Sequence, residues 1–421
     1  MTDNIPEFPE AVPIKDGHAG IGVVGNQSPA FGSQGPVLSE TLDRGEGVFT
    51  DVARLRSIDF LRGLAALSVV VLHMTLSNLV PRYQALWFRV LYFVAMLGHF
   101  GVALFFVILG FCIHLRWAKH ASDLSFFQFW KRRLHRLYPP YFVVLCLSML
   151  MVYGSYRLGM QTALGEKYPA PQGWWMLWDF FLHSTMLHGL SYRFDTAGGD
   201  NVMWSLAREE YFYLLYFPLL FLRKKAGLLK TVGLIFLLGL TANFVFSFTS
   251  HYLFWGRSAI VLWPQWCLGM VSVEAYFARV TLPRWCYSLQ FAGAFFCLTL
   301  LCRNRWVVLQ PFLVGLAFFV LINFCVAREQ QGKWSTAYLT RWLAGVGVFS
   351  YSLYLVHNPI RAVVNSLLRH FVNTDNQYVF VAVGVVVGVI CYWGGKLFFL
   401  VVERRFLNTQ APNAEPGIVD V

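Results

Sequence analysis

Arg62 and His73 are the two residues of the first apolar stretch whose types and spacing could support chemistry. They are eleven residues apart, so on a helix both side chains share one face, about 16 Å apart along the axis. Asp59 precedes Arg62 by three residues and can pair with it. Because ionisable groups within an apolar helix are costly, we interpret this pattern as a functional cation and imidazole; the alternative is a structural ion pair and a packed histidine.

A second candidate is the basic segment at residues 129–139, Phe-Trp-Lys-Arg-Arg-Leu-His-Arg-Leu-Tyr-Pro. Arg133 and Arg136 are three residues apart and face the same way at the start of a helix. Guanidinium groups bind phosphate oxygens in a bidentate manner. The segment therefore predicts a phosphate-binding pair or, equally, an ordinary basic anchor at a membrane surface.

The third candidate begins at Trp204 and carries Ser205 and Glu209 four residues apart on one helix face. Arg208, Glu209 and Glu210 enter an apolar run here, which is costly unless they are paired or hydrated. One interpretation is a site at Ser205 and Glu209. The other is that Arg208 neutralises one of the glutamates at the outer interface.

The fourth candidate is residues 350–359, in which Tyr351 is followed by His357 directly before Asn-Pro. A residue before Asn-Pro is expected at a kink or a helix end. The spacing alone allows a catalytic His357 or a histidine that caps freed carbonyl groups. The glycines of residues 98–111 instead favour close packing between helices, with the role of His99 left open.

The composition shows what must position these residues. Of 421 residues, 57% are hydrophobic and 13% are charged, with a mean hydropathy of +0.52, whereas soluble domains have about 25% charged residues. The chain is therefore an integral membrane protein. Its net charge of +12 fits basic cytoplasmic loops better than a nucleic-acid partner. The eight cysteines form no CxxC pair and indicate neither a disulfide framework nor a metal site.

Ten apolar stretches are candidate membrane spans, which predicts an all-α polytopic protein. With both termini in the cytoplasm, the inside flanks hold roughly twice as many Lys and Arg residues as the outside loops. We expect residues 1–52 to be a disordered cytoplasmic tail, 53–406 the transmembrane domain and 407–421 a short C-terminal tail. Residues 173–190 predict an interfacial or re-entrant helix. The expected spans are about 57–80, 92–115, 137–154, 203–222, 228–249, 258–277, 286–302, 306–326, 343–365 and 379–402.

Two function classes fit these residues. A buried histidine, carboxylates and a cytoplasmic arginine pair suit an enzyme with a phosphorylated cytoplasmic donor. They also suit a proton-coupled transporter or a flippase that moves a glycan or small molecule. Transporters often contain repeat-related broken helices, a pattern that the sequence does not show.

In this order, the motifs resemble those of the acyltransferase-3 family of membrane-bound O-acyltransferases over about residues 54–405. The matching pieces are Arg56-Ser-Ile-Asp-Phe-Leu-Arg62-Gly-Leu-Ala-Ala with His73, Gly101-Val-Ala-Leu-Phe-Phe-Val-Ile-Leu-Gly-Phe111, and residues 129–139, 204–213 and 350–359. Two departures stand out. Leu109 precedes Gly110 where the family often has serine, and Ala207-Arg208 replaces small or apolar residues. The soluble esterase-like domain fused to some members is not expected here.

The resemblance implies a bundle of about ten helices that transfers an acyl group, most often acetyl, from acyl-CoA to a hydroxyl group. The implied acceptors are carbohydrates such as exopolysaccharide, lipopolysaccharide or a lipid-linked sugar, or else a small hydrophobic metabolite. We expect a bacterial inner-membrane protein that uses acetyl-CoA and needs no metal.

The resemblance also assigns roles to residues. Arg62, Arg133 and Arg136 are expected to bind the phosphates of CoA, and His73 to accept the proton of the acceptor hydroxyl. An acyl-His73 intermediate is a variant of this mechanism. The remaining expected site residues are Glu209 and Asp59 as further catalytic groups, and Ser205, Trp204, His357 and Tyr351 in binding or structural roles.

Overall fold

All regular secondary structure in the described part of the chain is helical. The computed structural model describes residues 55–75, 85–120, 125–157, 173–195, 202–302, 304–368, 372 and 376–407. The tail expected at residues 1–52 lies outside these residues, as does the tail expected at 407–421 except for Leu407. The helices are α1 (Arg56–Thr75), α2 (Leu86–Met96), η1 (Leu97–Phe100), α3 (Gly101–His120), α4 (Phe126–Arg157), α5 (Gly173–Ser184), η2 (Leu187–Leu190), α6 (Trp204–Ala226), α7 (Leu228–Phe246), α8 (Tyr252–Trp255), α9 (Ala259–Tyr276), η3 (Arg284–Tyr287), α10 (Leu289–Leu301), η4 (Asn304–Leu309), α11 (Gln310–Gln330), α12 (Tyr338–Val348), α13 (Ser350–Leu368), α14 (Gln377–Val401) and η5 (Glu403–Phe406).

Six helical segments of the described chain are long and apolar enough to cross a membrane. They are Arg56–Thr75, Leu86–Ala118, Phe126–Gly154, Leu228–Phe246, Trp306–Gln330 and Gln377–Phe406. The other four expected spans also fall on helices, but these differ in kind. Helix α6 is more polar, α10 is short, α9 is almost wholly buried, and the stretch 343–365 is divided between α12 and α13 at Phe349.

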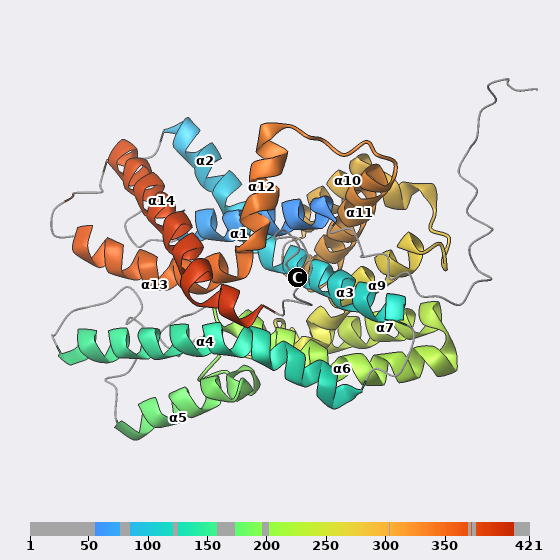
Figure 1. Ribbon diagram of the computed structural model, residues 1–421, viewed down its shortest axis with the longest axis horizontal. Coiled ribbons are helices and arrows are strands. Elements are labelled where there is room, and N and C mark those ends of the chain that lie inside the picture. The colour runs from blue at the N-terminus through green and yellow to red at the C-terminus, as the bar shows by residue number, and fades with distance from the viewer. Residues whose placement is uncertain are drawn as a thin grey trace, which may run out of the picture. The chain divides into compact units, whose positions relative to one another are not determined.

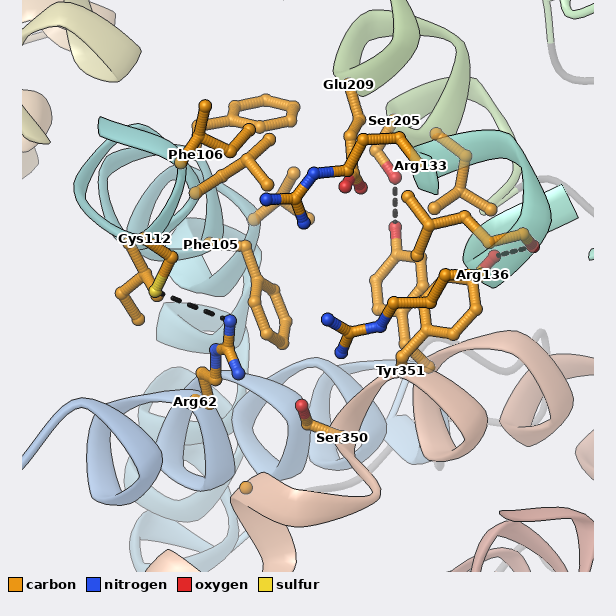
Figure 2. Close-up of a pocket in the computed structure, with 18 of the residues that line it drawn as sticks. Arg62, Phe105, Phe106, Cys112, Arg133, Arg136, Ser205, Glu209, Ser350 and Tyr351 are labelled. Atoms are coloured by element: carbon orange, nitrogen blue, oxygen red, sulfur yellow. Dashed lines mark hydrogen bonds between the residues drawn. The ribbon is translucent and has the colours of Figure 1, made fainter. Parts of the chain in front are cut away.

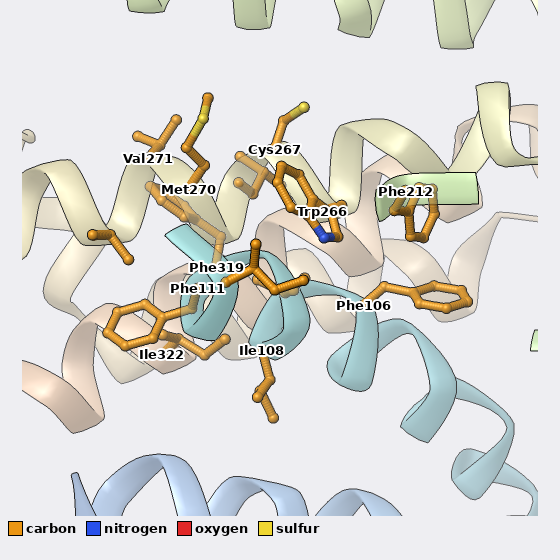
Figure 3. Close-up of a cluster of buried hydrophobic side chains, with 14 of the residues drawn as sticks. Phe106, Ile108, Phe111, Phe212, Trp266, Cys267, Met270, Val271, Phe319 and Ile322 are labelled. Atoms are coloured by element: carbon orange, nitrogen blue, oxygen red, sulfur yellow. The ribbon is translucent and has the colours of Figure 1, made fainter. Parts of the chain in front are cut away.

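Helix α9 lies within the bundle and is buried from Val261 to Glu274. It packs against α3, α7 and α11 (Figure 1). A side-chain carbon on Gly110 of α3 would lie 1.9 Å from the carbonyl oxygen of Trp266, and one on Gly269 of α9 would lie 2.0 Å from that of Val107. The packing role expected for the glycines of residues 98–111 is therefore confirmed at Gly110. Large side chains around Trp266 fill the space on either side of this crossing (Figure 3).

Helix α1, which carries Arg62 and His73, is fixed by two kinds of contact. The backbone N–H groups of Arg56 and Ser57 donate to the carboxylate of Glu329 in α11, at 2.7 and 2.9 Å. These donors have no partner within the helix, so Glu329 caps its N-terminus. Helix α1 also packs against α12, where a side-chain carbon on Gly347 would lie 1.9 Å from the carbonyl oxygen of Asp59.

The start of α13 is held by a carboxylate from the other end of the domain. Glu403 of η5 accepts hydrogen bonds from the backbone N–H of Ser352, at 3.1 Å, and from its hydroxyl group. Helix α13 then packs along α14 (Figure 1). This cap and the turn at Phe349 set the direction in which α13 presents Tyr351 and His357.

Helix α5, in the segment expected to be interfacial or re-entrant, lies beside α4 (Figure 1). Trp174, Leu177, Trp178 and Phe181 are exposed along one face. The opposite face buries His183. This is the amphipathic pattern of a helix that lies at an interface.

Candidate functional site

Three arginines from two helices surround one pocket, which we call the arginine pocket. Arg62 of α1 and Arg133 and Arg136 of α4 line it. Figure 2 shows their guanidinium groups pointing into the same space. The space not filled by atoms is about 890 Å³, open mouth included. The lining also includes Val102, Phe106, Cys112, Ser205, Glu209, Tyr213, Tyr351, Tyr354 and Glu403.

Neither Glu209 nor Glu403 forms an ion pair with these arginines in the described part of the chain. Each carboxylate has a hydroxyl partner instead: Tyr213 donates to Glu209 and Ser352 donates to Glu403. The pocket lining thus carries three guanidinium groups and two carboxylates.

Weak contacts hold the arginines in place. The guanidinium carbon of Arg133 lies 5.7 Å from the ring centre of Phe129 and 5.9 Å from that of Tyr213. Arg62 donates to the sulfur of Cys112 at 3.4 Å, drawn in Figure 2. The buried Nε of Arg136 has no hydrogen-bond partner among the described residues. Most guanidinium donors therefore stay available to a ligand, and a net positive site of this kind suits phosphate groups.

Burial separates these arginines from their basic neighbours. Lys131 and Arg132 are exposed, whereas Arg133 and Arg136 are half-buried. The alternative of an ordinary basic anchor thus describes Lys131 and Arg132. It does not describe the pair in the pocket.

A second pocket, which we call the histidine pocket, contains His73. Its lining includes His99, Trp204, Arg257 and Gln265, and it lies where α1 ends and α6, α9 and α11 begin. Val102, Phe106 and Tyr354 line both this pocket and the arginine pocket. The two pockets therefore meet at these three side chains. His73 lines the histidine pocket, one side of this shared boundary.

The ring of His73 is oriented by two neighbours. Its Nδ1 lies 2.9 Å from the carbonyl oxygen of Val69 and 3.4 Å from Nε2 of His357. A carbonyl oxygen can only accept, so in the neutral ring Nδ1 carries the hydrogen. The same argument applies to His357, whose Nδ1 lies 2.6 Å from the carbonyl oxygen of Tyr354. Nε2 of His73 is then left with a lone pair that can accept a proton.

His357 has contacts on both ring nitrogens, and its expected roles, catalytic or capping, stay predictions. One nitrogen contacts carbonyl oxygens of the preceding turn, and the other faces His73. Of the two expectations for the stretch before Pro359, a helix end is wrong, because α13 continues past the proline to Leu368; a kink at this point stays a prediction. The break in this stretch lies earlier, at Phe349.

A polar pair marks the junction of the pockets. The hydroxyl groups of Ser205 and Tyr354 are 2.6 Å apart, and the carbonyl oxygen of Val202 lies 3.2 Å from the first and 3.1 Å from the second. Since each hydroxyl group has one hydrogen, one of them donates to the other, which in turn donates to Val202. Ser205 lines the arginine pocket, and Trp204 beside it lines the histidine pocket. The start of α6 therefore contributes to both pockets.

The expected site residues fall into three groups. The arginine pocket contains Arg62, Arg133, Arg136, Ser205, Glu209 and Tyr351, and the histidine pocket contains His73 and Trp204. His357 contacts His73 from behind. Asp59 is buried and lines neither pocket.

The alternative in which Arg208 neutralises a neighbouring glutamate is wrong. Arg208 pairs with Asp195 at 2.8 Å, while Glu210 accepts a hydrogen bond from the indole of Trp130. The geometry favours Asp195 because Arg208 is fully buried on the side of α6 that faces the segment after η2.

Sequence reasoning missed Tyr354, Glu403 and Arg257. Tyr354 had a usable signal, because it precedes His357 by three residues and lies near it on the helix surface. Glu403 had no signal in the sequence, since it reaches the pocket only because η5 folds back against the start of α13. Arg257 lies just before the expected span 258–277, where the sequence marks it only as a basic residue of an outside loop.

Comparisons with known proteins agree with the motifs. The acyltransferase-3 family, described as an acyltransferase domain, matches residues 55–394. The peptidoglycan O-acetyltransferase OatA of Listeria monocytogenes is 27% identical over 74% of this chain and 50% of its own length. The putative peptidoglycan O-acetyltransferase YrhL of Bacillus subtilis is 25% identical over 72% and 48%. The O-acetyltransferase OatA of Staphylococcus aureus is 24% identical over 74% and 51%.

The chain thus spans about half the length of these curated relatives. No solved structure matches it.

Proposed function

This chain belongs to the acyltransferase-3 family, and on that premise we propose that it transfers an acetyl group from acetyl-CoA to a hydroxyl group of a glycan at the membrane. The observation that carries the proposal is a pair of adjacent pockets that share three lining side chains, with arginines in one and His73 in the other. Two substrates could meet there from opposite ends. A glycan acceptor is supported by the names of the relatives, which are peptidoglycan O-acetyltransferases.

Acetyl-CoA as the donor is supported by the arginine pocket. CoA carries several phosphate groups, and Arg62, Arg133 and Arg136 present donors that no carboxylate of the described chain engages. With the phosphates bound there, the pantetheine arm would extend past Phe106 and Tyr354 toward His73. The thioester carbonyl would then lie at the junction.

The acceptor would enter the histidine pocket with a hydroxyl group directed at Nε2 of His73. As the hydroxyl oxygen attacks the thioester carbonyl, Nε2 takes its proton. The tetrahedral intermediate collapses with cleavage of the carbon–sulfur bond, and His73 returns the proton to the CoA thiolate. His357 accepts from Nδ1–H of His73 and keeps the ring oriented while it carries the positive charge.

The two proposed catalytic carboxylates have different surroundings. Glu209 lies in the arginine pocket beside Tyr213, which supports a role in positioning the donor-binding arginines more than in orienting the base. Asp59 lies where α1 meets α12, which supports a structural role.

We also retain the expected topology of ten spans with both termini in the cytoplasm of a bacterial cell. The exposed Lys131 and Arg132 next to the arginine pocket support a cytoplasmic mouth for the donor. The histidine pocket would then open toward the opposite leaflet, where surface glycans are found.

The test is the fate of labelled acetyl groups. Membranes containing the chain, incubated with acetyl-labelled acetyl-CoA and a peptidoglycan-derived oligosaccharide, should place the label on the sugar and release free CoA in equal amount. Membranes containing His73→Gln serve as the inactive control. Transport of unmodified sugar without CoA release would support the transporter alternative instead, and label found only on a small hydrophobic metabolite would contradict the glycan acceptor.

A further inference from the structure

The histidine pocket contains a cation that has no carboxylate of its own. Arg257 is half-buried and lines the pocket. Its neighbour Arg208 is paired with Asp195 at 2.8 Å, whereas Arg257 forms no ion pair in the described part of the chain. Counting these described residues alone, two guanidinium groups thus accompany one carboxylate, and their sum beside the pocket is a net positive charge.

Arg257 is held in place by contacts that do not use its side-chain N–H groups. Its guanidinium carbon lies 5.0 Å from the ring centre of Trp204, a cation–π distance. Its backbone carbonyl accepts a hydrogen bond from Nε of Arg208 at 2.9 Å. An aromatic ring and a backbone bond therefore fix this residue without neutralising it.

The rest of the pocket lining does not supply a negative charge. Among its described residues there is no Asp or Glu, and its other polar members are histidines, glutamines, Trp204 and tyrosines. A partly desolvated cation is costly unless a ligand or water completes its hydrogen bonds. A neutral sugar would form only ordinary hydrogen bonds with Arg257, whereas an anionic group would form charge-assisted, bidentate ones.

We propose that the acceptor is an anionic sugar, whose carboxylate or phosphate group binds Arg257 while one of its hydroxyl groups faces His73. This rests on the proposed function, since it places the acceptor in the histidine pocket. The anion serves for recognition and takes no part in bond making. Arg257 is therefore a specificity-determining residue for the acceptor.

A competing role for Arg257 would be to stabilise the oxyanion that forms on the thioester carbonyl. That role predicts a fall in kcat for every acceptor, charged or neutral. Recognition of an anionic acceptor predicts a rise in KM for charged acceptors alone. The two roles therefore separate in kinetics with matched acceptors.

The experiment uses two pairs of acceptors that differ in charge. N-acetylmuramic acid is compared with its methyl ester, and N-acetylglucosamine 1-phosphate with N-acetylglucosamine, using the protein in nanodiscs with labelled acetyl-CoA. The wild type should prefer the charged member of at least one pair. Arg257→Gln should lower kcat/KM for that member by about 10- to 100-fold, the worth of a charge-assisted hydrogen bond, through KM. The neutral member should be unaffected.

Two variants serve as controls. Arg257→Lys keeps the charge and should keep part of the preference, which matters if Arg257→Gln does not fold. Arg193→Gln removes an exposed arginine close in sequence to Asp195 but outside the pocket lining. It should leave the preference intact. Preference for the carboxylate pair alone identifies a sugar acid, and preference for the phosphate pair alone identifies a phosphorylated, lipid-linked type of acceptor.

Binding of the same four sugars is measured without acetyl-CoA, by saturation-transfer NMR. If the wild type acetylates none of them, the proposed function fails while the binding comparison still tests the anion site. Equal use or binding of charged and neutral members by the wild type would overturn the proposal. So would an equal loss for both members in Arg257→Gln.

Discussion

Two clusters of buried charge lie in the bundle, and they are built in opposite ways. In the first, Glu274 of α9 accepts from His114 at 2.6 Å, pairs with Arg223 at 2.9 Å and lies 3.7 Å from Arg279. In the arginine pocket, the carboxylates are bonded to hydroxyl groups, and the arginines have no ion pair among the described residues.

The difference predicts which charges serve stability and which serve binding. The Glu274 cluster joins α3, α6 and α9, and its carboxylate is saturated by its partners. It lines neither the arginine pocket nor the histidine pocket. In the arginine pocket, guanidinium N–H groups are left without partners among the described residues. This lowers the stability of the fold but favours binding of an anionic ligand. Changes in the two pockets should therefore affect activity, and changes at Glu274 should affect stability.

The largest effect is expected from His73→Ala. Loss of the general base should lower acetyl transfer by about 10²- to 10⁴-fold, while CoA binding and the melting temperature stay close to wild type. Transfer is measured by CoA release, and CoA binding by calorimetry. The control is His251→Ala, since His251 is exposed and stacks on Tyr192 outside both pocket linings. Normal turnover in His73→Ala would remove the proposed base.

The next effect is expected from the double variant Arg133→Ala/Arg136→Ala. Loss of two charge-assisted contacts should weaken CoA binding by about 100-fold or more, with unchanged or higher thermal stability because mutual repulsion is relieved. The matched control is Lys131→Ala/Arg132→Ala, which removes two exposed charges from the same turn. Equal donor affinity in the two double variants would contradict the assignment of the arginine pocket.

Glu274→Gln should act on stability alone. Breaking the buried pairs leaves cations without a counter-charge and should cost about 3 kcal/mol, seen as a melting temperature several degrees lower in detergent. Arg279→Ala is the control, because the Arg279 side chain is 43% exposed and its contact with Glu274 should contribute little. A variant that melts normally but loses CoA affinity would break the distinction between the two clusters.

The smallest effect is expected from Tyr354→Phe at the junction of the pockets. The change removes the hydrogen bonds of the hydroxyl group to Ser205 and Val202 but keeps the ring that lines both pockets. At about 1 kcal/mol per bond, transfer should fall by a factor of about five to thirty. A loss above a thousandfold would instead make this hydroxyl group part of the chemistry.

The sequence predicted the local parts of the site well. The eleven-residue spacing of Arg62 and His73 placed them in two different pockets along one helix, and the spacing of Arg133 and Arg136 directed both into one pocket. These relations follow from helix geometry within a single element. The all-helical class followed in the same way from composition and from the length of the apolar runs.

The parts that sequence reasoning missed depend on contacts between distant segments. His357 reaches His73 across 284 positions, and Glu403 reaches Ser352 across 51. The choice of Asp195 as partner of Arg208 depends on a loop that returns over the start of α6. The residue pattern within one helix cannot predict such long-range contacts. The helix break at Phe349 could not be predicted either, because no proline precedes it.

Helix α13 connects the two pockets. Tyr351, Tyr354 and His357 follow one another at three-residue steps along about 9 Å of its axis; the first lines the arginine pocket, the second lines both pockets, and the third contacts His73. Because a helix is rigid, α13 cannot shift at one end alone. Under the proposed function, binding of the donor and alignment of the base would both depend on the position of this one helix, whose start is held by the hydrogen bonds between Ser352 and Glu403.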